Sequence, residues 1–251
     1  MKPLSTLIRL ACWASAALLS QGAAAESAVS ADATPVRVLL APALETTLVS
    51  QMSGRIVEVN AVLGRAFTKG QVLIRFDCSE QQARVAMSEA ERASAEQELE
   101  VKLRLQGLQQ ATEVEVGLAA SLVEKTRAQV RMVKAQLAWC SVVAPFTGRT
   151  AKVLVRPFQG VAANQPLLEA VSDGPLKLRL NMPGVWLRWL KIGTAFSVAI
   201  DETGKTYEAR VTAINARVDA VSQTVELEAT LATRAPELLP GMSGNARFNP
   251  P

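Results

Sequence analysis

The sequence predicts a mainly β fold interrupted by an α-helical coiled-coil hairpin, with a small β-sandwich split by the hairpin and a separate small β-barrel. Three observations predict it. Between Gln71 and Ala144 there is no proline, and the only glycines are Gly107 and Gly117, whereas both residue types recur every few positions elsewhere. The segments on the two sides of this stretch repeat each other. The last third of the chain alternates apolar and polar residues in short runs, which is typical of strands.

The composition excludes several classes of function. The chain has 251 residues, 27 Lys and Arg against 23 Asp and Glu, and no histidine. Histidine-based triads, histidine acid–base catalysis and ordinary histidine-ligated zinc sites are therefore excluded. Aromatic residues make up only 4% and the net charge is +4, which disfavours a nucleic-acid surface. We expect a protein without catalytic activity.

The first 25 residues are typical of a secretory signal peptide. Lys2 and Arg9 are followed by an apolar run from Leu10 to Leu19, and small residues precede a cleavage point between Ala25 and Glu26. The apolar run is about half the ~20 residues that a membrane-spanning helix needs. We expect a soluble, exported mature protein in an oxidising compartment.

The proline-free stretch predicts two antiparallel helices, over Cys78–Gln106 and Glu113–Ser141. Gly107 can take the left-handed conformation that ends the first helix, and Thr112 with Glu115 forms a capping box for the second. Two overlapping capping boxes compete at the start of the first helix: Asp77 with Glu80, and Ser79 with Gln82.

Each helix carries a candidate seam for packing against the other. The second helix has a regular heptad pattern, formed by Val116, Ala119, Val123, Thr126, Val130, Val133 and Leu137. The first helix has a looser pattern, formed by Ala83, Ala86, Ala90, Ala93, Leu99 and Leu103. We expect these two seams to face each other.

Cys78 and Cys140 are equidistant from the loop Gly107–Ala111, so they face each other at the base of an antiparallel hairpin. We predict a disulfide between them, favoured by the oxidising compartment. In the chain-entropy model a loop of this length contributes about 4 kcal/mol. The alternatives are two unpaired buried thiols or a two-cysteine metal site.

The flanking segments repeat with an offset of 94 residues. Leu48–Arg55 resembles Val142–Arg149, and further apolar and polar positions match beyond them. Neither half can bury its own apolar face, so we expect both halves to pack as one sandwich from which the hairpin projects.

Six short strands with alternating pattern predict the barrel. They are expected at Val36–Leu40, Leu176–Leu180, Ala195–Ile200, Tyr207–Ile214, Thr224–Leu231 and Gly244–Phe248. One brief helix is expected within Pro183–Lys191, and Asp201–Gly204 reads as a hairpin turn.

This order of elements resembles the periplasmic adaptor, or membrane-fusion (HlyD-like), family of tripartite efflux and type I secretion systems. The resemblance covers nearly the whole mature chain. It rests on the split repeat, which looks like the family's biotin/lipoyl-like domain, and on three phrases: Ala144-Pro145-Phe146-Thr147-Gly148-Arg149, Val218-Asp219 with Ser222-Gln223-Thr224-Val225, and Leu239-Pro240-Gly241-Met242.

The resemblance implies a domain order and a set of partners. The expected order is a signal peptide over 1–25, a flexible N-terminus over 26–35, a first barrel strand and link over 36–47, a first lipoyl-like half over 48–77, a hairpin over 78–141, a second half over 142–173 and the barrel over 174–251. The implied role is to bridge an inner-membrane transporter, ATP-driven or of the resistance–nodulation–division (RND) type, to an outer-membrane TolC-like channel. The implied assembly is a homo-oligomeric ring in the periplasm.

Two departures from the family pattern matter. The family's membrane-proximal domain is expected to be absent, because little sequence precedes Val36 and the chain stops at Pro251. At the hairpin tip the family carries an arginine, then a leucine, then a serine. Leu105 and Thr112 fit the last two positions, but Val101 stands at the arginine position. An envelope scaffold or binding protein that keeps the adaptor architecture is therefore the alternative function.

Candidate docking residues follow from this resemblance. The tip, over 105–112, offers Leu105, Gly107, Leu108, Gln109, Gln110, Ala111 and Thr112 for contact with an outer-membrane duct. The alternative is an ordinary turn with Leu108 folded back on the helices. Trp186 and Trp189 either contact a partner or cap the end of the barrel core. Lys69 is expected to be an ordinary strand-turn lysine, and no lipoyl, biotin or other cofactor is expected.

Overall fold

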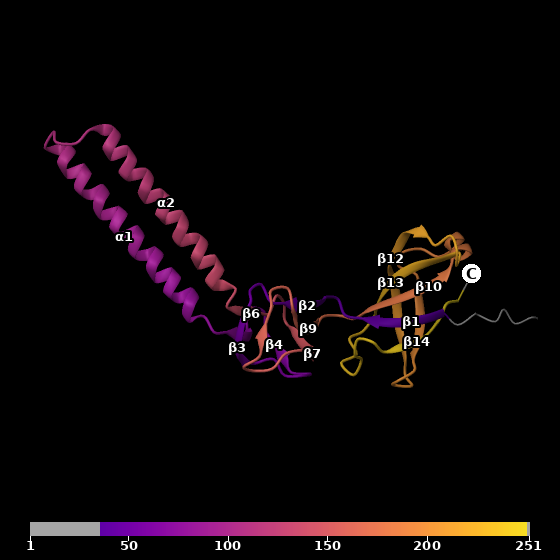
Figure 1. The fold of residues 1–251 in the computed structure, drawn as a ribbon. Helices are drawn as coiled ribbons and strands as arrows, with labels where there is room; N and C mark the ends of the chain where they lie inside the picture. Colours follow the sequence, from indigo (N-terminus) through magenta and orange to yellow (C-terminus); the bar gives the residue numbers. More distant parts are fainter. Residues whose placement is uncertain (1–35, 250–251) are drawn as a thin grey trace, which may run out of the picture. The chain divides into compact units, whose positions relative to one another are not determined.

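The computed structural model describes residues 36–249, which form a β-barrel, a two-sheet β module and a two-helix hairpin (Figure 1). The predicted cleavage point, Ala25–Glu26, lies outside the described residues. Neither described helix is long and apolar enough to cross a bilayer.

The barrel closes from six antiparallel strands in the order β1-β10-β13-β12-β11-β14. Their bounds are β1 Val36–Ala41, β10 Lys177–Pro183, β11 Ala195–Ile200, β12 Thr206–Val218, β13 Thr224–Leu231 and β14 Ser243–Arg247. All six expected strands are present. The strand β12 continues four residues past the predicted Ile214, because its ladder with β13 extends to the pair Val218–Val225. The expected short helix is a 3-10 helix, η1, at Gly184–Arg188.

The β module consists of two four-stranded sheets, in the orders β2-β9-β7-β4 and β6-β5-β3-β8. The strands are β2 Glu45–Val49, β3 Gly54–Val59, β4 Ala66–Phe67, β5 Val72–Phe76, β6 Ser141–Val143, β7 Gly148–Val153, β8 Gly160–Val161 and β9 Pro166–Ser172. Each sheet takes strands from both sides of the hairpin.

The repeat of 94 residues maps one sheet of the module onto the other: β2 corresponds to β6, β9 to β5, β7 to β3 and β4 to β8. Both halves also contribute to one core, with Ile56, Leu73 and Ile74 from the first half and Leu167 and Leu168 from the second. Neither half therefore has a separate core, as the repeat predicts.

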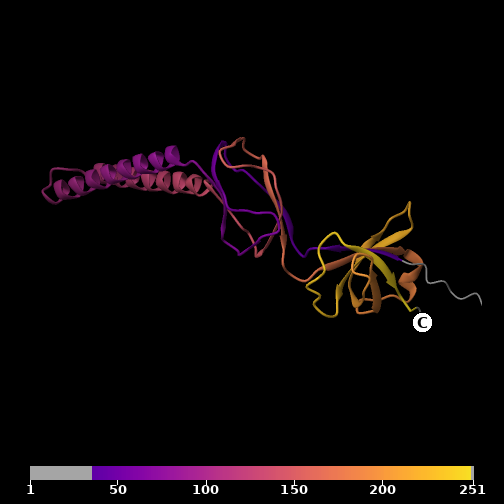
Figure 2. The same ribbon diagram turned by 90° about the horizontal axis from the view of Figure 1, so that it is seen from below.

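The hairpin consists of α1, Ser79–Gly107, and α2, Glu113–Ala138 (Figure 2). The second helix ends three residues before the predicted Ser141, because Ser141 pairs with Arg75 in the sheet as the start of β6. Neither capping box predicted for α1 forms. Cys78 is the N-cap without a side-chain hydrogen bond, and Asp77 Oδ1 instead accepts from the backbone N–H and the hydroxyl of Ser79.

The predicted seam of α2 packs on α1, and four of its members are buried: Ala119, Val123, Val130 and Val133. The predicted seam of α1 is wrong. The buried residues of α1 are Val85, Ser88 and Ala95. Of the predicted seam, Leu99 is half-buried and the others are exposed: Ala83, Ala86, Ala90, Ala93 and Leu103. Alanines occur on several faces of α1, so their spacing did not select the face that meets the valines of α2.

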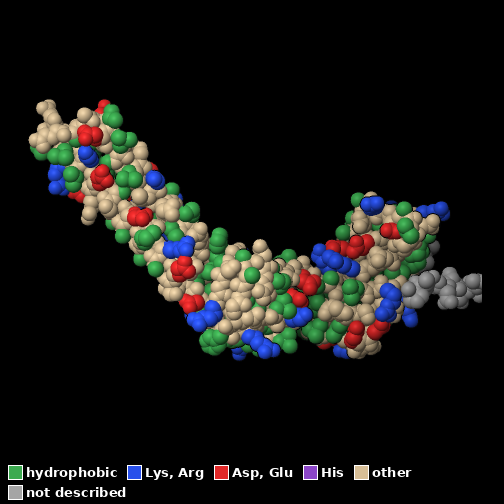
Figure 3. All heavy atoms as spheres, in the orientation of Figure 1, with side chains coloured by type: hydrophobic (Ala, Val, Ile, Leu, Met, Phe, Trp, Pro, Cys, Tyr) green, Lys and Arg blue, Asp and Glu red, His purple; other side chains and the backbone are tan. Residues whose placement is uncertain are grey.

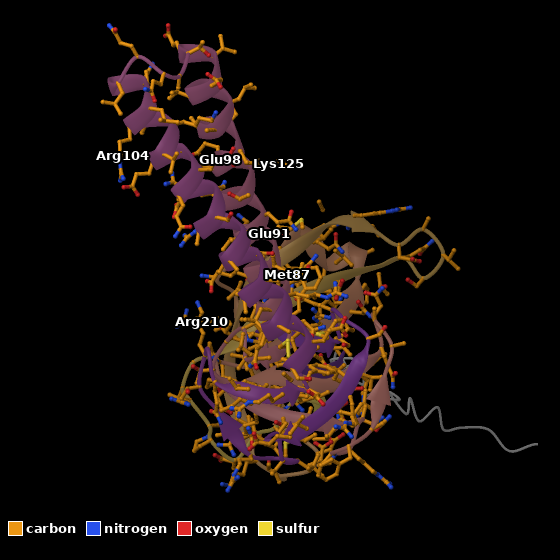
Figure 4. All side chains as sticks on the ribbon, turned by 60° about the vertical axis from the view of Figure 1, so that its left-hand side comes forward. Met87, Glu91, Glu98, Arg104, Lys125 and Arg210 are labelled. Atoms are coloured by element: carbon orange, nitrogen blue, oxygen red, sulfur yellow. A yellow bond between two sulfur atoms is a disulfide. The ribbon has the colours of Figure 1, made fainter. Side chains whose placement is uncertain are left out.

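Three ion pairs join the two helices. Glu89 Oε1 lies 2.6 Å from Lys134 Nζ, Glu96 Oε1 lies 3.2 Å from Arg127, and Lys102 Nζ lies 3.1 Å from Glu115 Oε1. Positive and negative side chains are interspersed along the hairpin (Figure 3). The labelled side chains Met87, Glu91, Glu98, Arg104 and Lys125 project outward from it (Figure 4). Exposed pairs of this kind contribute little stability, so the cross-helix pairs mainly help to fix the register of α1 against α2.

Candidate functional site

The tip of the hairpin is an ordered turn that ends α1 with a Schellman motif. The N–H of Gln110 donates to the carbonyl of Leu105 at 2.8 Å, and that of Gln109 donates to Gln106 at 2.9 Å. Gln109 takes the left-handed conformation, with φ 58°. The expectation that Gly107 takes it was wrong, because Gly107 remains helical as the last residue of α1. Glycine permits the left-handed conformation without requiring it.

The start of α2 confirms the predicted capping box. The N–H of Thr112 donates to Glu115 Oε2 at 2.8 Å, and the N–H of Glu115 donates to Thr112 Oγ1 at 3.3 Å. Lys102 of α1 also donates to Glu115 Oε1. The backbone hydrogen bond from Thr112, followed by the contact with Lys102, lowers the pKa of Glu115 from 4.5 to about 2. One carboxylate thus ties the loop, α1 and α2 together.

The ordered tip presents an apolar side chain to solvent. Leu108 is 65% exposed, so it is not folded back on the helices. The structure brings the other predicted tip residues to the same turn: Gly107, Gln109, Gln110 and Thr112 are exposed, and Leu105 and Ala111 are half-buried.

Sequence analysis missed Val114 and Leu118, which are 71% and 67% exposed on the first turns of α2. Their spacing of four residues, outside the heptad seam, is the signal that could have found them. An exposed apolar cluster of this kind is suited to contact with a partner.

The base of the hairpin is closed covalently. Cys78 and Cys140 form the predicted disulfide, with a Cα–Cα distance of 6.0 Å. The bond joins the residue before α1 to the residue before β6, and the N–H of Phe76 donates to the carbonyl of Cys140 at 2.9 Å beside it. The hydrogen bonds from Ser79, and then the contact with Arg55, lower the pKa of Asp77 at this junction. Both helices are therefore fixed to the sheet where they leave it.

Trp186 on η1 and Trp189 directly after η1 are half-buried and pack against the barrel core. Their rings are 5.5 Å apart and meet Phe248 edge-on at 5.7 Å and 6.2 Å, while Phe248 stacks on Phe196 at 4.5 Å. The two indoles therefore cap the end of the barrel core. This is one of the two roles that the sequence allowed for them, the other being contact with a partner. Part of each indole still faces solvent.

Within residues 36–249, no three Cys, Asp or Glu side chains are grouped so that they could hold a metal ion. Lys69 lies in the turn before β5, where its N–H donates to Thr147 Oγ1 at 3.2 Å. Its position agrees with the reading as a turn lysine.

Comparison with solved structures identifies the architecture. The membrane fusion protein Spr0693 from Streptococcus pneumoniae R6 superposes with a TM-score of 0.73 at 16% identity, over 86% of this chain and 99% of that one. A MacA-MexA chimeric protein that contains the Pseudomonas aeruginosa MexA α-hairpin domain gives 0.75 at 17% identity, over 86% and 82% of the two chains. The chain has the fold of the membrane-fusion, or periplasmic adaptor, proteins. The resemblance drawn from the sequence is confirmed.

Sequence comparisons agree with this adaptor fold. The family described as "CusB-like, beta-barrel domain" matches residues 178–251. Nodulation protein NolF of Rhizobium meliloti is 27% identical over 212 residues, covering 78% of this adaptor-like chain and 58% of NolF. An uncharacterized protein of Haemophilus influenzae is 24% identical over 212 residues, covering 84% and 56%. The chain therefore spans less than two thirds of the length of these curated relatives.

Proposed function

We propose that this protein is a periplasmic adaptor subunit that bridges an inner-membrane transporter and an outer-membrane channel in a tripartite efflux or secretion system. The exposed apolar tip carries the proposal. Leu108 lies on the tip turn, and Val114 and Leu118 lie on the first turns of α2. The Schellman motif and the capping box fix this turn, and the disulfide fixes the far end of the helices. A preorganised apolar tip loses little conformational entropy when it docks.

The proposal also assigns a role to the other parts. The two-sheet module is a lipoyl-like sandwich that the hairpin splits. Copies of the chain form a ring through which the transported substrate passes. The mature chain works in the periplasm after cleavage between Ala25 and Glu26. The role is mechanical: the protein seals a conduit and transmits conformational change, with no catalytic step.

Leu108→Asp tests the docking role. A charge at the tip disfavours burial against a channel, so co-purification of an outer-membrane channel after mild cross-linking of envelopes should fall at least tenfold. The matched control is Met87→Asp, which places the same charge at an exposed apolar position of α1 far from the tip. Unchanged recovery with Leu108→Asp, or equal loss with both variants, would remove the tip from the docking site.

An envelope scaffold that serves no transporter is the second candidate, favoured by Val101. This residue is 52% exposed where the adaptor pattern has an arginine, so the tip lacks that charged contact. The same cross-linking experiment separates the two functions. Recovery of a transporter and a channel supports the adaptor, whereas recovery of envelope assembly proteins without either supports the scaffold.

A further inference from the structure

Strand directions define two ends of the barrel. All six strands are antiparallel to their neighbours, so the connections between them lie at two ends of the barrel. At one end lie the start of β1, the end of β14, the β12–β13 turn, and η1 with the loop that follows it to β11. We call this the η1 end. Both connections to the β module, after Ala41 and before Lys177, leave from the opposite end. The η1 end is thus free of the links to the rest of the described chain.

The η1 end carries exposed apolar side chains on its turns. Val221 is 96% exposed at the β12–β13 turn, Ile192 is 67% exposed in the loop before β11, and Val185 is 63% exposed on η1. Leu187 and Val218 are also exposed there. The loops at the opposite end, 201–205 and 232–242, contribute one exposed large apolar residue, Leu239, and the link after β1 contributes one more, Leu44. Exposed apolar side chains are therefore concentrated at the η1 end.

The charges are divided in the same way. The loops of the η1 end carry two exposed cations, Arg188 and Lys191, and one carboxylate, Asp219. The exposed cations Arg217 and Arg247 stand at the ends of β12 and β14, at the level of the exposed carboxylates Glu226 and Glu208 on neighbouring strands. None of the four cations forms an ion pair within residues 36–249. The loops at the opposite end carry two cations and three carboxylates. The loops of the η1 end therefore carry a small excess of positive charge, whereas those of the opposite end carry a small excess of negative charge.

The turns that carry these side chains are held in place. Asp219 Oδ1 accepts hydrogen bonds from the N–H groups of Val221 at 3.0 Å and Ser222 at 2.8 Å, so the one carboxylate is engaged within its own turn. The N–H of Gly184 donates to the carbonyl of Gln223 at 2.9 Å, which joins η1 to the β12–β13 turn. Beneath them lie the half-exposed indoles of Trp186 and Trp189. The surface is preformed.

We propose that the η1 end binds the surface of an anionic lipid bilayer. Single apolar side chains on rigid turns can insert at the boundary between headgroups and acyl chains, while the surrounding cations pair with lipid phosphates. Val221 projects almost fully into solvent, so it offers a side chain for insertion rather than a socket for a partner's side chain. Indole rings half-exposed beneath the turns suit the same boundary. The proposal does not depend on docking of the hairpin tip to a channel.

Vesicle co-sedimentation of the mature protein tests the proposal. We expect binding to vesicles that contain equal parts of phosphatidylglycerol and phosphatidylcholine, and weak binding to phosphatidylcholine alone. Binding should weaken as salt rises, because salt screens the attraction between cations and phosphates. Each surface cation contributes about fivefold, so the triple variant Arg188→Ala, Lys191→Ala, Arg217→Ala should lower binding by about 100-fold.

Matched variants separate the ends of the barrel. Val221→Asp should also reduce vesicle binding, whereas Leu239→Asp and Arg234→Ala, at the opposite end, should leave it unchanged. Thermal unfolding checks that all variants fold. The proposal is overturned if the mature protein does not bind anionic vesicles at low salt, or if the controls lose binding equally. It is also wrong if the η1-end variants keep vesicle binding but lose an inner-membrane protein partner, because the surface is then a protein interface.

Discussion

At the residue scale, the internal repeat exposes one strained position. Phe158 has φ 66° and is 75% exposed in the turn Arg156–Gln159, after Pro157. The repeat of 94 residues places it opposite Gly64, which has φ 73° in the turn Val62–Arg65. The backbone hydrogen bonds match as well, from Phe158 to Ile56 and from Gly64 to Thr150, both at 2.8 Å. Both turns therefore require a residue in the left-handed conformation, and only the turn Val62–Arg65 has glycine at that position.

Phe158→Gly should stabilise the protein by about 0.5–1 kcal/mol, since relief of left-handed strain exceeds the entropy that glycine adds to the unfolded chain. The measurement is urea unfolding followed by circular dichroism. The converse variant, Gly64→Ala, should destabilise by about 1 kcal/mol, because no side chain is favoured at its φ. A destabilised Phe158→Gly would mean that the phenyl ring makes a stabilising contact.

At the element scale, the two helices of the hairpin contribute different residues to their interface. The buried residues of α2 are mainly valines, whereas α1 packs against them with smaller or polar residues such as Ser88 and Ala95. The tip is fixed by hydrogen bonds, and the base by a disulfide across a sequence separation of 62 residues. The electrostatic part of this design converges on Glu115, which holds Thr112 and Lys102.

The hairpin should lose stability in acid through Glu115. Its folded-state pKa of about 2 lies below the ordinary 4.5, so its contribution is fully present above pH 4.5 and is lost as the pH falls towards 2. The melting temperature, followed by helical circular dichroism, should therefore drop between pH 4.5 and 2. Glu115→Gln should flatten this drop, whereas Glu98→Gln, on an exposed site without an ion pair among the described residues, should not. Equal acid sensitivity of all three proteins would contradict the assignment.

At the scale of the whole molecule, the described residues form two separate apolar cores. One fills the barrel, with Val198 and Leu227 among its fully buried members, and the other fills the β module, with Ile56 and Leu168. No residue belongs to both clusters. Each module therefore has a core of its own, so we expect the two modules to unfold separately.

Calorimetry should resolve two transitions, one for each core. Leu168→Ala should lower the free energy of unfolding of the β module only, and Leu227→Ala that of the barrel only. Each loss should be about 2–5 kcal/mol, because both side chains are fully buried. The helical signal should disappear with the β module, to which the disulfide ties the hairpin. A single transition that both variants shift alike would show that the two modules unfold together.

The sequence by itself determined the features that depend on local spacing. The proline-free stretch defined the hairpin, the 94-residue offset indicated a shared module, the six alternating runs gave the barrel strands, and symmetry about the tip paired Cys78 with Cys140. Each follows from periodicity or chain reach, which a sequence records directly.

Only the tertiary structure decided which of several similar local options is used. The buried face of α1 is not the one marked by its alanines. The left-handed residue is Gln109 rather than Gly107, and neither capping box predicted at Asp77 and Ser79 forms. The tertiary structure also gathered Val185, Ile192 and Val221 at one end of the barrel. These choices depend on contacts between residues far apart in the chain, whose energies are comparable to the small local preferences that they override.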